Sequence, residues 1–445
     1  MYYHELLARR YRSLVPKGQR VLELGCGNGR LLAALNPKVG VGIDFSKGAI
    51  ALAKSRYPSH HWIQADAHEL PLSGTFDVII LSDLVNDLWD VQLLLERLKK
   101  LVHHRTRIIL NSYSRLWQLP LSIFETLGLK QKTLQQNWLT VEDLENLMGL
   151  TDYQTIKTTP EILFPLKVPL LSSFLNGFLA KLPFFNLFAL TNFIVTRPMQ
   201  GARAAVPSVS IIIPARNEAG NIAEIFKRVP QIGSALEFIF VEGHSKDTTY
   251  KVIEDEIEKN PQVKSLLLKQ SGIGKANAVW QGFAAASNDI LFILDSDLSV
   301  PPEDLERFFQ AIASNKGEFI NGTRLVYPME QKAMQAANLV GNKAFSMIFS
   351  WLLGQPVKDT LCGTKVLYRS DFELLKREYE LFNKVDPFGD FDLLVGSSRI
   401  NLKIVDLPVR YRERKYGQTN IQRWRHGWML LRITLAAMFS LKFSS

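Results

Sequence analysis

The chain has 445 residues, of which 47% are apolar and 22% charged. This composition excludes a disordered or fibrous protein, and the length predicts two globular domains. Only two cysteines are present, which excludes a disulfide scaffold, and the formal net charge of +10 favours an anionic partner such as nucleic acid, a phosphorylated substrate or a membrane surface.

The first 200 residues alternate predicted strands with helical patterns. Apolar strands are expected at 20–25, 39–44, 61–66, 76–83 and 107–113, with helical patterns between them. This alternation predicts an α/β domain with a parallel sheet covered on both faces. Two later strands are expected at 153–163 and 191–198, on either side of an apolar stretch.

A glycine-rich turn, 25–29, follows the first predicted strand and opens a helix. Glycine lets the backbone approach a ligand closely, and a helix N-terminus favours polar or anionic groups. A dinucleotide-binding turn would need a third glycine at position 30, where the chain has Arg30. The alternative without a ligand is a tight strand–helix turn and nothing more.

This turn and the segments after it resemble class I S-adenosylmethionine-dependent methyltransferases over about residues 1–200. The G-x-G-x-G spacing with an acid two residues upstream resembles their motif I. The resemblance implies that the cofactor S-adenosylmethionine is held at its ribose by Asp44 and at its adenine by Asp66 and Ala67, and that its methionine moiety borders the strand end at Ser82. The implied cofactor contacts are Glu23, Gly25, Gly27, Asp44, Asp66, Ala67 and Ser82.

The methyl acceptor and its base are left open. Near the expected strand ends lie Asp83, Asn86, Asp87 and His68, and the pattern singles out none of them. His68 is expected to be a solvated loop residue.

Residues 201–208 are predicted to link a domain over 1–200 to a second domain over 209–425, because the surrounding segment is rich in Pro, Gly and Ala. In the second half, polar segments follow three buried strands, at 214–218, 241–247 and 295–297. On an extended chain, Asp295 and Asp297 would share one face, where Mg²⁺ or Mn²⁺ and substrate phosphates would join them. The alternative is an acidic surface turn.

These segments resemble family-2 glycosyltransferases, which have an A-type fold and use nucleotide sugars, over about residues 206–425. The resemblance implies a metal on Asp295 and Asp297, both catalytic, and inversion at the sugar. The implied nucleotide-sugar contacts are Pro214, Asn217, Glu218, Glu242, Lys275 and Asp295.

A narrower resemblance, to polyprenyl-phosphate glycosyltransferases such as dolichol-phosphate mannose synthases, is carried by 295–303, 321–324, 359–369 and 411–420. It implies that Arg324 and Arg414 surround the acceptor phosphate and the diphosphate. It also makes Asp390 the general base for a hydroxyl acceptor, whereas a phosphate acceptor is already ionised and needs none.

The C-terminus, 421–445, is predicted to form an amphipathic helix. One stripe holds Trp424, Trp428, Leu431, Leu435 and Met438, and basic residues precede the helix. This pattern favours an interfacial position on anionic lipid, with the apolar stretch 162–190 beside it. The alternative is that the stripe packs on the domain core. The sequence has neither a signal-peptide core at 1–16 nor a run long enough to span a bilayer.

We therefore expect an α/β protein of two domains, a Rossmann-like methyltransferase sheet and an A-type glycosyltransferase. The predicted function is a bifunctional transferase, cytoplasmic and peripherally associated with the membrane, acting on a lipid-linked phosphate or glycan. The main alternative is a glycosyltransferase with a non-catalytic S-adenosylmethionine-binding module. A nucleic-acid methyltransferase ranks last, because the basic residues cluster at 410–425 rather than around the first turn.

Overall fold

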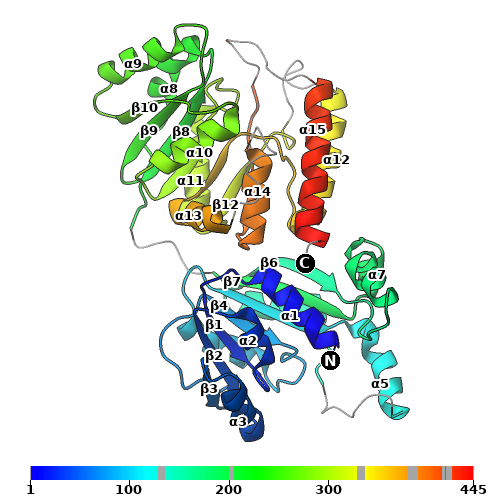
Figure 1. Cartoon of the computed structure of the whole chain (residues 1–445). Coiled ribbons are helices and arrows are strands. Elements are labelled where there is room, and N and C mark those ends of the chain that lie inside the picture. Colours follow the sequence, from blue (N-terminus) through cyan, green and yellow to red (C-terminus); the bar gives the residue numbers. More distant parts are fainter. Residues whose placement is uncertain are drawn as a thin grey trace. The chain divides into compact units, whose positions relative to one another are not determined.

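The computed structural model describes residues 2–128, 136–199, 205–327, 336–378, 389–412, 416 and 423–443. The chain divides into two compact units, one of residues 1–200 with 442–445 and one of residues 201–441. Each unit contains a seven-stranded sheet with helices packed against it (Figure 1). The expected α/β fold class is therefore confirmed.

The first sheet has the strand order β3-β2-β1-β4-β5-β7-β6. Its strands are β1 (Arg20–Leu24), β2 (Val39–Asp44), β3 (His61–Gln64), β4 (Val78–Ser82), β5 (Arg107–Tyr113), β6 (Tyr153–Glu161) and β7 (Thr191–Pro198). The first five strands are parallel, whereas β7 runs antiparallel to both β5 and β6. The expected parallel sheet is thus confirmed for the first five strands, and β7 is the strand of this sheet that runs in the opposite direction.

Alternation along the strands puts apolar side chains on both faces of this sheet. In β1, Val21 joins one buried cluster and Leu22 the other. The helices are α1 (Tyr2–Leu14), α2 (Arg30–Leu35), α3 (Lys47–Arg56), α4 (Val91–Leu98), α5 (Gln118–Thr126), α6 (Val141–Leu150) and α7 (Leu171–Gly177). Within α1, the buried residues Leu7, Tyr11 and Leu14 recur at helical spacing.

The second sheet has the order β10-β9-β8-β11-β13-β12-β14. Its strands are β8 (Val209–Ala215), β9 (Leu236–Glu242), β10 (Lys264–Lys269), β11 (Ile290–Ile293), β12 (Phe319–Thr323), β13 (Lys365–Tyr368) and β14 (Ile404–Pro408). Four parallel strands are followed by β13, which is antiparallel to β11 and β12. Strands β13 and β14 were not expected from the sequence.

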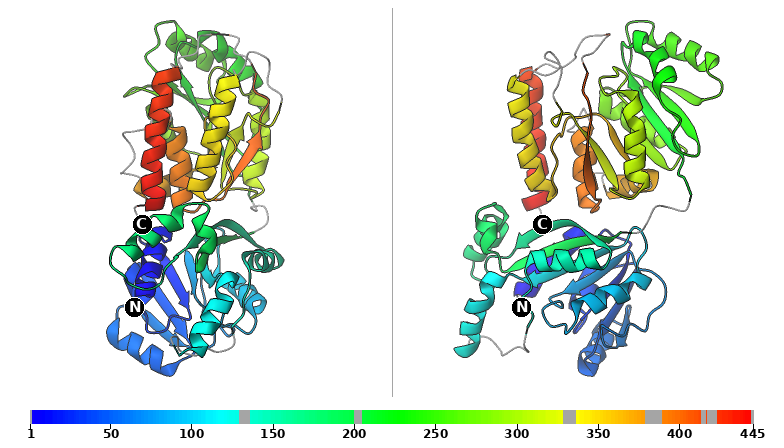
Figure 2. Two further views of the ribbon diagram at one scale, coloured as in Figure 1. Left: turned by 90° about the vertical axis from the view of Figure 1, so that its right-hand side faces the viewer. Right: turned by 180° about the vertical axis from the view of Figure 1, so that it is seen from behind.

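Helices cover this sheet too (Figure 2). They are α8 (Ile222–Arg228), α9 (Thr249–Lys259), α10 (Lys275–Ala285), α11 (Leu305–Ala313), α12 (Ala336–Leu353), α13 (Arg369–Glu378), α14 (Asp390–Arg399) and α15 (Arg423–Met438). Alternate residues of β8 again enter different clusters, Ile212 on one face and Ile211 on the other.

The order of the adjacent parallel strands reverses between β1 and β4 in the first sheet and between β8 and β11 in the second. Ligands of open α/β sheets bind outside the carboxyl ends of the strands at such a reversal. The glycine-rich turn follows β1, and Asp295 and Asp297 follow β11, so both predicted sites lie at a reversal.

Helix α15 lies beside α12 in the second unit (Figure 1). Its residues Leu430, Ile433 and Ala437 are buried in the core. Trp428 and Leu435, which belong to the predicted stripe, are exposed. The side chain of Trp424 lies outside the described residues. No helix in the described part of the chain is long and apolar enough to cross a membrane.

Candidate active sites

The turn after β1 is open to a ligand at one of its three glycines. Gly25, Gly27 and Gly29 all have positive φ, which side chains rarely adopt. A Cβ at Gly25 would lie 2.8 Å from Leu84, and one at Gly29 would overlap the ring of Trp62, whereas a Cβ at Gly27 would meet nothing within 4 Å. The backbone at Gly27 is therefore the part of the turn that a ligand can approach.

Two acids from neighbouring strands hold this turn. Asp44, at the end of β2, accepts hydrogen bonds from the backbone N–H of Gly27 at 2.8 Å and of Ser46 at 2.9 Å. Glu23, on β1, is 2% exposed and accepts a bond from the Leu32 N–H at 3.1 Å. Burial raises the pKa of Glu23 to about 8. The structure thus brings Glu23, Gly27 and Asp44 together.

The predicted adenine segment lies after β3. Asp66 is exposed, and one carboxylate oxygen contacts both the backbone N–H and the Nδ1 of His68 at 2.8 Å, which lowers the pKa of Asp66. The Nε2 of His68 lies 3.0 Å from the Asp90 carbonyl, and its ring centroid lies 4.5 Å from that of the exposed Trp89. The expectation that His68 is solvated is wrong, because both ring nitrogens have protein partners. Ala67 is half-buried in the same segment.

Beyond β4, a network missed by the sequence analysis surrounds Asp83, which follows the predicted contact Ser82. The Tyr3 hydroxyl donates to Asp83 Oδ1 at 2.8 Å, and Asn111 Nδ2 donates to the same oxygen at 2.5 Å. The Asn111 Oδ1 accepts from the Tyr11 hydroxyl at 2.7 Å and from the Asp83 N–H at 3.2 Å. No local signal could place Tyr3 here, because α1 reaches the strand ends only through packing.

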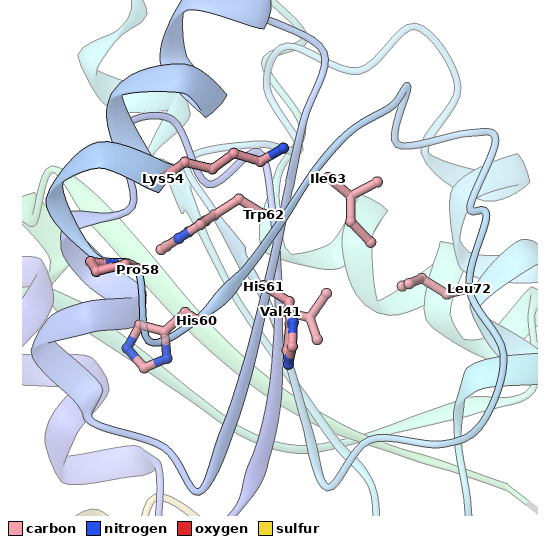
Figure 3. A pocket seen from close by; sticks show the side chains of 8 residues that line it. All are labelled: Val41, Lys54, Pro58, His60, His61, Trp62, Ile63 and Leu72. Carbon is pink, nitrogen blue, oxygen red and sulfur yellow. The ribbon is translucent and has the colours of Figure 1, made fainter.

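A separate open hollow of about 570 Å³ lies at the β3 edge of the first sheet. Figure 3 shows the eight side chains that line it, which are Val41, Lys54, Pro58, His60, His61, Trp62, Ile63 and Leu72. None of them is a predicted cofactor contact. The hollow therefore does not coincide with the turn after β1.

In the second unit, Asp295 and Asp297 lie on a turn rather than on an extended chain. The Leu298 N–H donates to the Asp295 carbonyl at 3.2 Å, and Leu298 has a positive φ. Asp297 is 8% exposed and its Oδ1 accepts from the Ser299 N–H at 2.9 Å. The expected reason for their proximity is thus wrong, because the strand β11 ends at Ile293.

A lysine already neutralises part of this acidic turn. Lys275, the first residue of α10, places its Nζ 2.5 Å from Asp295 Oδ1. Burial alone would lower the pKa of Lys275, but attraction to Asp295 and Asp390 outweighs it and raises that pKa. The backbone of Gly363 lies so near that a Cβ there would overlap both Lys275 and Asp295. The 359–369 motif is therefore brought against the acidic turn.

Asp390 lies next to this group. It is the first residue of α14 and is 5% exposed. A Cβ at the preceding Gly389 would lie 3.1 Å from Ala276, so the starts of α14 and α10 meet. Asp390 Oδ1 lies 3.5 Å from the Nζ of Lys365, which also donates to the Cys362 carbonyl at 2.7 Å. The predicted base is thus buried beside two cations.

The predicted nucleotide contacts lie on two loops that bond to each other. Asn217 accepts from the Lys246 N–H at 2.8 Å, and Glu242 accepts from the Ser245 N–H at 2.5 Å. Glu218 is buried and accepts from Asn221 at 2.7 Å. The carbonyl of Pro214 accepts from Ser296 at 2.8 Å, which joins these loops to the acidic turn. The structure therefore brings together Pro214, Asn217, Glu218, Glu242, Lys275 and Asp295 at one end of the sheet.

Of the two predicted phosphate-binding arginines, Arg324 is paired with a buried acid. Its Nε and Nη2 lie 2.7 and 2.9 Å from the two carboxylate oxygens of Asp359, which is fully buried. Its guanidinium also lies 5.2 Å from the ring centre of Tyr411. Arg414 lies outside the described residues. Tyr416, from the same motif, packs on Gly220, where a Cβ would lie 2.7 Å from its ring.

Asp295 and Asp297 could hold a divalent cation only together with oxygen atoms of a bound substrate. Among the described residues, no three His, Cys, Asp or Glu side chains form a metal-binding group. Asp295 and Asp297 are hard oxygen donors, and the Asp295 side chain is 28% exposed beside Lys275. Mg²⁺ is commonly held by one or two carboxylates and substrate phosphates. The two residues fit that arrangement.

Comparisons with known proteins assign each unit. Residues 16–155 match a methyltransferase domain family, and residues 210–375 match glycosyl transferase family 2. Both resemblances predicted from the motifs are therefore confirmed.

Three curated relatives match about half of the chain. The dolichol-phosphate mannosyltransferase of Pyrococcus furiosus is 27% identical, over 48% of this chain and 59% of its own length. The glycosyltransferase AglD of Haloferax volcanii is 24% identical, over 49% of this chain and 35% of its own length. A Salmonella undecaprenyl-phosphate 4-deoxy-4-formamido-L-arabinose transferase is 22% identical, over 48% of this chain and 63% of its own length. The chain thus spans less than two thirds of each relative. Among solved structures, a Thermotoga maritima S-adenosylmethionine-dependent methyltransferase matches at 17% identity with a TM-score of 0.36, over 44% of this chain and 90% of its own.

Proposed function

We propose that this chain, which joins a methyltransferase domain to a family 2 glycosyltransferase domain, transfers a sugar from a nucleotide sugar to a polyprenyl phosphate. The observation that carries this proposal is the group formed by Asp295, Lys275 and the backbone of Gly363 at the strand reversal of the second sheet. Two of the relatives are named for transfer to dolichol phosphate or undecaprenyl phosphate. The chain's own acceptor-side motif, 359–369, reaches the same group.

Lys275 is the residue best placed to act on the donor. A nucleoside diphosphate leaves with negative charge on its bridging oxygen, and a fixed cation nearby lowers the energy of that state. Mg²⁺ or Mn²⁺ held by Asp295 and Asp297 would supply further positive charge when bound. The half-buried Lys275 holds its proton at neutral pH, because its pKa is raised by Asp295 and Asp390 against the effect of partial burial.

The acceptor phosphate needs no base, since it is ionised at neutral pH. It attacks the sugar from the face opposite the diphosphate, which inverts the anomeric carbon. Asp390 then serves to hold Lys365 and Lys275 rather than to take a proton. Arg324 is oriented by Asp359 and Tyr411, and its Nη1 is the atom it can offer to a phosphate, together with Arg414.

A lipid-linked acceptor requires the protein to reach a membrane. Helix α15 exposes Trp428, Leu431 and Leu435, with Arg432 exposed among them. In the first unit, the stretch 162–190 has Lys167 and Lys181 as its only charged residues. Its exposed large apolar residues are Leu166, Val168, Leu170, Leu171, Phe174, Phe178, Phe184, Phe185, Leu187 and Phe188. Lys167 is exposed, whereas Lys181 is mostly buried and pairs with Glu161. Exposed apolar surface with a cation and no acids suits an interface of anionic lipid.

Liposome flotation tests the membrane part. We expect the full chain to bind vesicles of phosphatidylcholine with phosphatidylglycerol, and high salt to weaken binding. Trp428→Ser with Leu431→Ser should reduce flotation, whereas Leu52→Ser, at an exposed position of α3, should not. A protein that stays unbound at low salt would contradict the interfacial proposal.

Donor turnover tests the transferase. Nucleotide sugars are screened with Mn²⁺ and undecaprenyl phosphate, and nucleoside diphosphate release is measured. We expect release that depends on both the lipid phosphate and the metal. Release that is unaffected when the lipid phosphate is left out, or when EDTA is added, would contradict the acceptor or the metal respectively.

A further inference from the structure

Asp83 is held in an uncommon conformation by two other elements, α1 and β5. It follows β4 with a φ of 52°, a left-handed conformation that costs a non-glycine residue energy. Tyr3 of α1 and Asn111 of β5 both donate to Oδ1, and Asn111 in turn is fixed by Tyr11 and the Asp83 N–H. Within the described residues, Oδ2 has no hydrogen-bond partner, and the residue is partly exposed. One carboxylate oxygen is therefore fixed and the other is available.

Asp83 stands at a strand end next to the predicted cofactor turn. Leu84, the next residue, packs so closely on Gly25 that a Cβ there would lie 2.8 Å from it. Strands β1 and β4 are adjacent and parallel at the strand reversal, so their carboxyl ends border the same crevice. A substrate bound next to the cofactor turn would therefore be within reach of Asp83.

Aromatic rings line the same place. The ring centroid of Tyr3 lies 6.3 Å from that of Tyr113, which lies 6.3 Å from that of Trp138. Two hydrogen bonds between Asn86 and Asn137 fasten the Trp138 segment to the loop after β4, an N–H···O bond of 2.7 Å and an Nδ2···O bond of 2.8 Å. A carboxylate beside a row of aromatic rings suits a sugar, whose C–H face packs on rings while a hydroxyl donates to the acid.

We propose that Asp83 is the catalytic base of the methyltransferase domain, and that the acceptor is a sugar hydroxyl. This inference rests on the proposed binding of S-adenosylmethionine by the first unit. The hydroxyl oxygen bonds to the methyl carbon as the carbon–sulfur bond breaks, and the electron pair of that bond stays on sulfur. The hydroxyl proton passes to Asp83 Oδ2, which leaves a methyl ether and S-adenosylhomocysteine. Tyr3 and Asn111 are positioning residues.

The charge of Asp83 agrees with this role. Burial raises its pKa to about 6, while the bonds from Tyr3 and Asn111 act in the opposite direction. The titratable groups that act on this network are Tyr3, Tyr11, Tyr113, Glu23 and Asp87. The carboxylate is therefore mostly ionised at pH 7.5 and can accept a proton.

The test compares Asp83→Asn with Asp87→Asn in the full chain. An asparagine at 83 keeps an oxygen for the bonds from Tyr3 and Asn111, so we expect the melting temperature not to fall. Asp87 is exposed on the same loop and bonds to Gln136 at 3.1 Å, so its variant is the matched control. Methyl transfer to the methyl glycosides of mannose, rhamnose and glucose should fall at least about a hundredfold in Asp83→Asn alone. The acid limb of the wild-type pH profile, near pH 6, should disappear with it.

Binding gives a readout that does not depend on turnover. Calorimetry with S-adenosylhomocysteine comes first, and we expect wild type and both variants to bind it equally. Octyl mannoside should then bind the loaded wild type and bind Asp83→Asn more weakly. If S-adenosylhomocysteine does not bind, the proposed function of this unit fails and the inference with it. If it binds, methylation of none of the glycosides, methylation of an amine probe only, or equal rates in wild type and Asp83→Asn would overturn the inference alone.

Discussion

The acids of the two units lie in different electrostatic surroundings. Glu23 on β1, Asp44 at the end of β2 and Asp83 after β4 are held by N–H and hydroxyl donors, and none has a Lys or Arg ion pair within the described residues. In the second unit, Asp295, Asp359 and Asp390 each lie within 3.5 Å of a Lys or Arg nitrogen. Asp44 and Asp83 are therefore placed to favour the sulfonium proposed at the first site, and the cations of the second unit to favour the proposed diphosphate.

The same sheet architecture can therefore serve two kinds of ligand, and the charged side chains placed around the acids decide which kind. Both predicted sites lie at a strand reversal, and each has an acid shortly after a strand, Asp83 after β4 and Asp295 after β11. The cations of the second site come from other elements, namely Lys275 on α10, Lys365 on β13 and Arg324 after β12. Substituting one acid at a time in each unit separates these two electrostatic surroundings.

The largest effect is expected where a cation would be left buried without its partner. Asp359→Asn removes the acid that pairs with Arg324, and breaking a buried pair costs about 3–5 kcal/mol. The free energy of unfolding, measured with urea, should fall by that amount. Glu303→Gln breaks the more exposed pair with Arg228 and should change stability by less than about 1 kcal/mol. Equal effects would show that burial does not distinguish the two pairs.

Asp295→Asn should abolish most glycosyl transfer. It removes a proposed metal ligand and the partner of Lys275, and loss of one such electrostatic group costs about 10²–10³-fold in kcat. Nucleoside diphosphate release measures this, with Asp289→Asn on the far end of β11 as a control for folding. S-adenosylhomocysteine binding should stay unchanged, and a parallel loss of it would mean that the two units are not independent.

Glu23→Gln should change how stability depends on pH. The folded pKa of Glu23 is raised from 4.5 to about 8, so the folded state favours its protonated form. Its contribution to stability is complete below pH 4.5 and is lost as pH rises through 8. The variant should be more stable than wild type at pH 7, by at most about 3 kcal/mol, and equally stable at pH 4. Parallel pH curves in thermal melts would contradict the raised pKa.

Asp44→Ala should weaken S-adenosylmethionine binding by about 1–3 kcal/mol, because it removes the acceptor that orders the Gly27 N–H as well as the proposed ribose contact. Calorimetry measures this, and Asp66→Ala, on an exposed acid, is expected to cost less. Binding of NAD in place of S-adenosylmethionine by the wild type would refute the assignment.

The sequence alone determined the features that depend on neighbouring residues. Most of the strands β1 to β12 follow from short apolar runs, because burial on both faces of a sheet needs continuous apolar sequence. The edge strands β6 and β10 mix apolar with polar residues. The turn after β1 and the acids Asp295 and Asp297 were found from the local pattern of strand, glycine and acid, and both family assignments followed from them. Strands β13 and β14 were not expected, because β13 has only four residues and β14 has five, the last of them a proline.

Tertiary packing alone decided which distant groups meet. Tyr3 lies 80 positions from Asp83, and the two meet because the buried face of α1 repeats every third or fourth residue and sets the helix against the strand ends. Lys275 meets Asp295 because α10 begins beside the acidic turn. The separate loop that contains Gly363 comes so close to both residues that a Cβ at 363 would overlap them. A local sequence pattern does not predict such contacts, because they depend on how whole helices and strands pack.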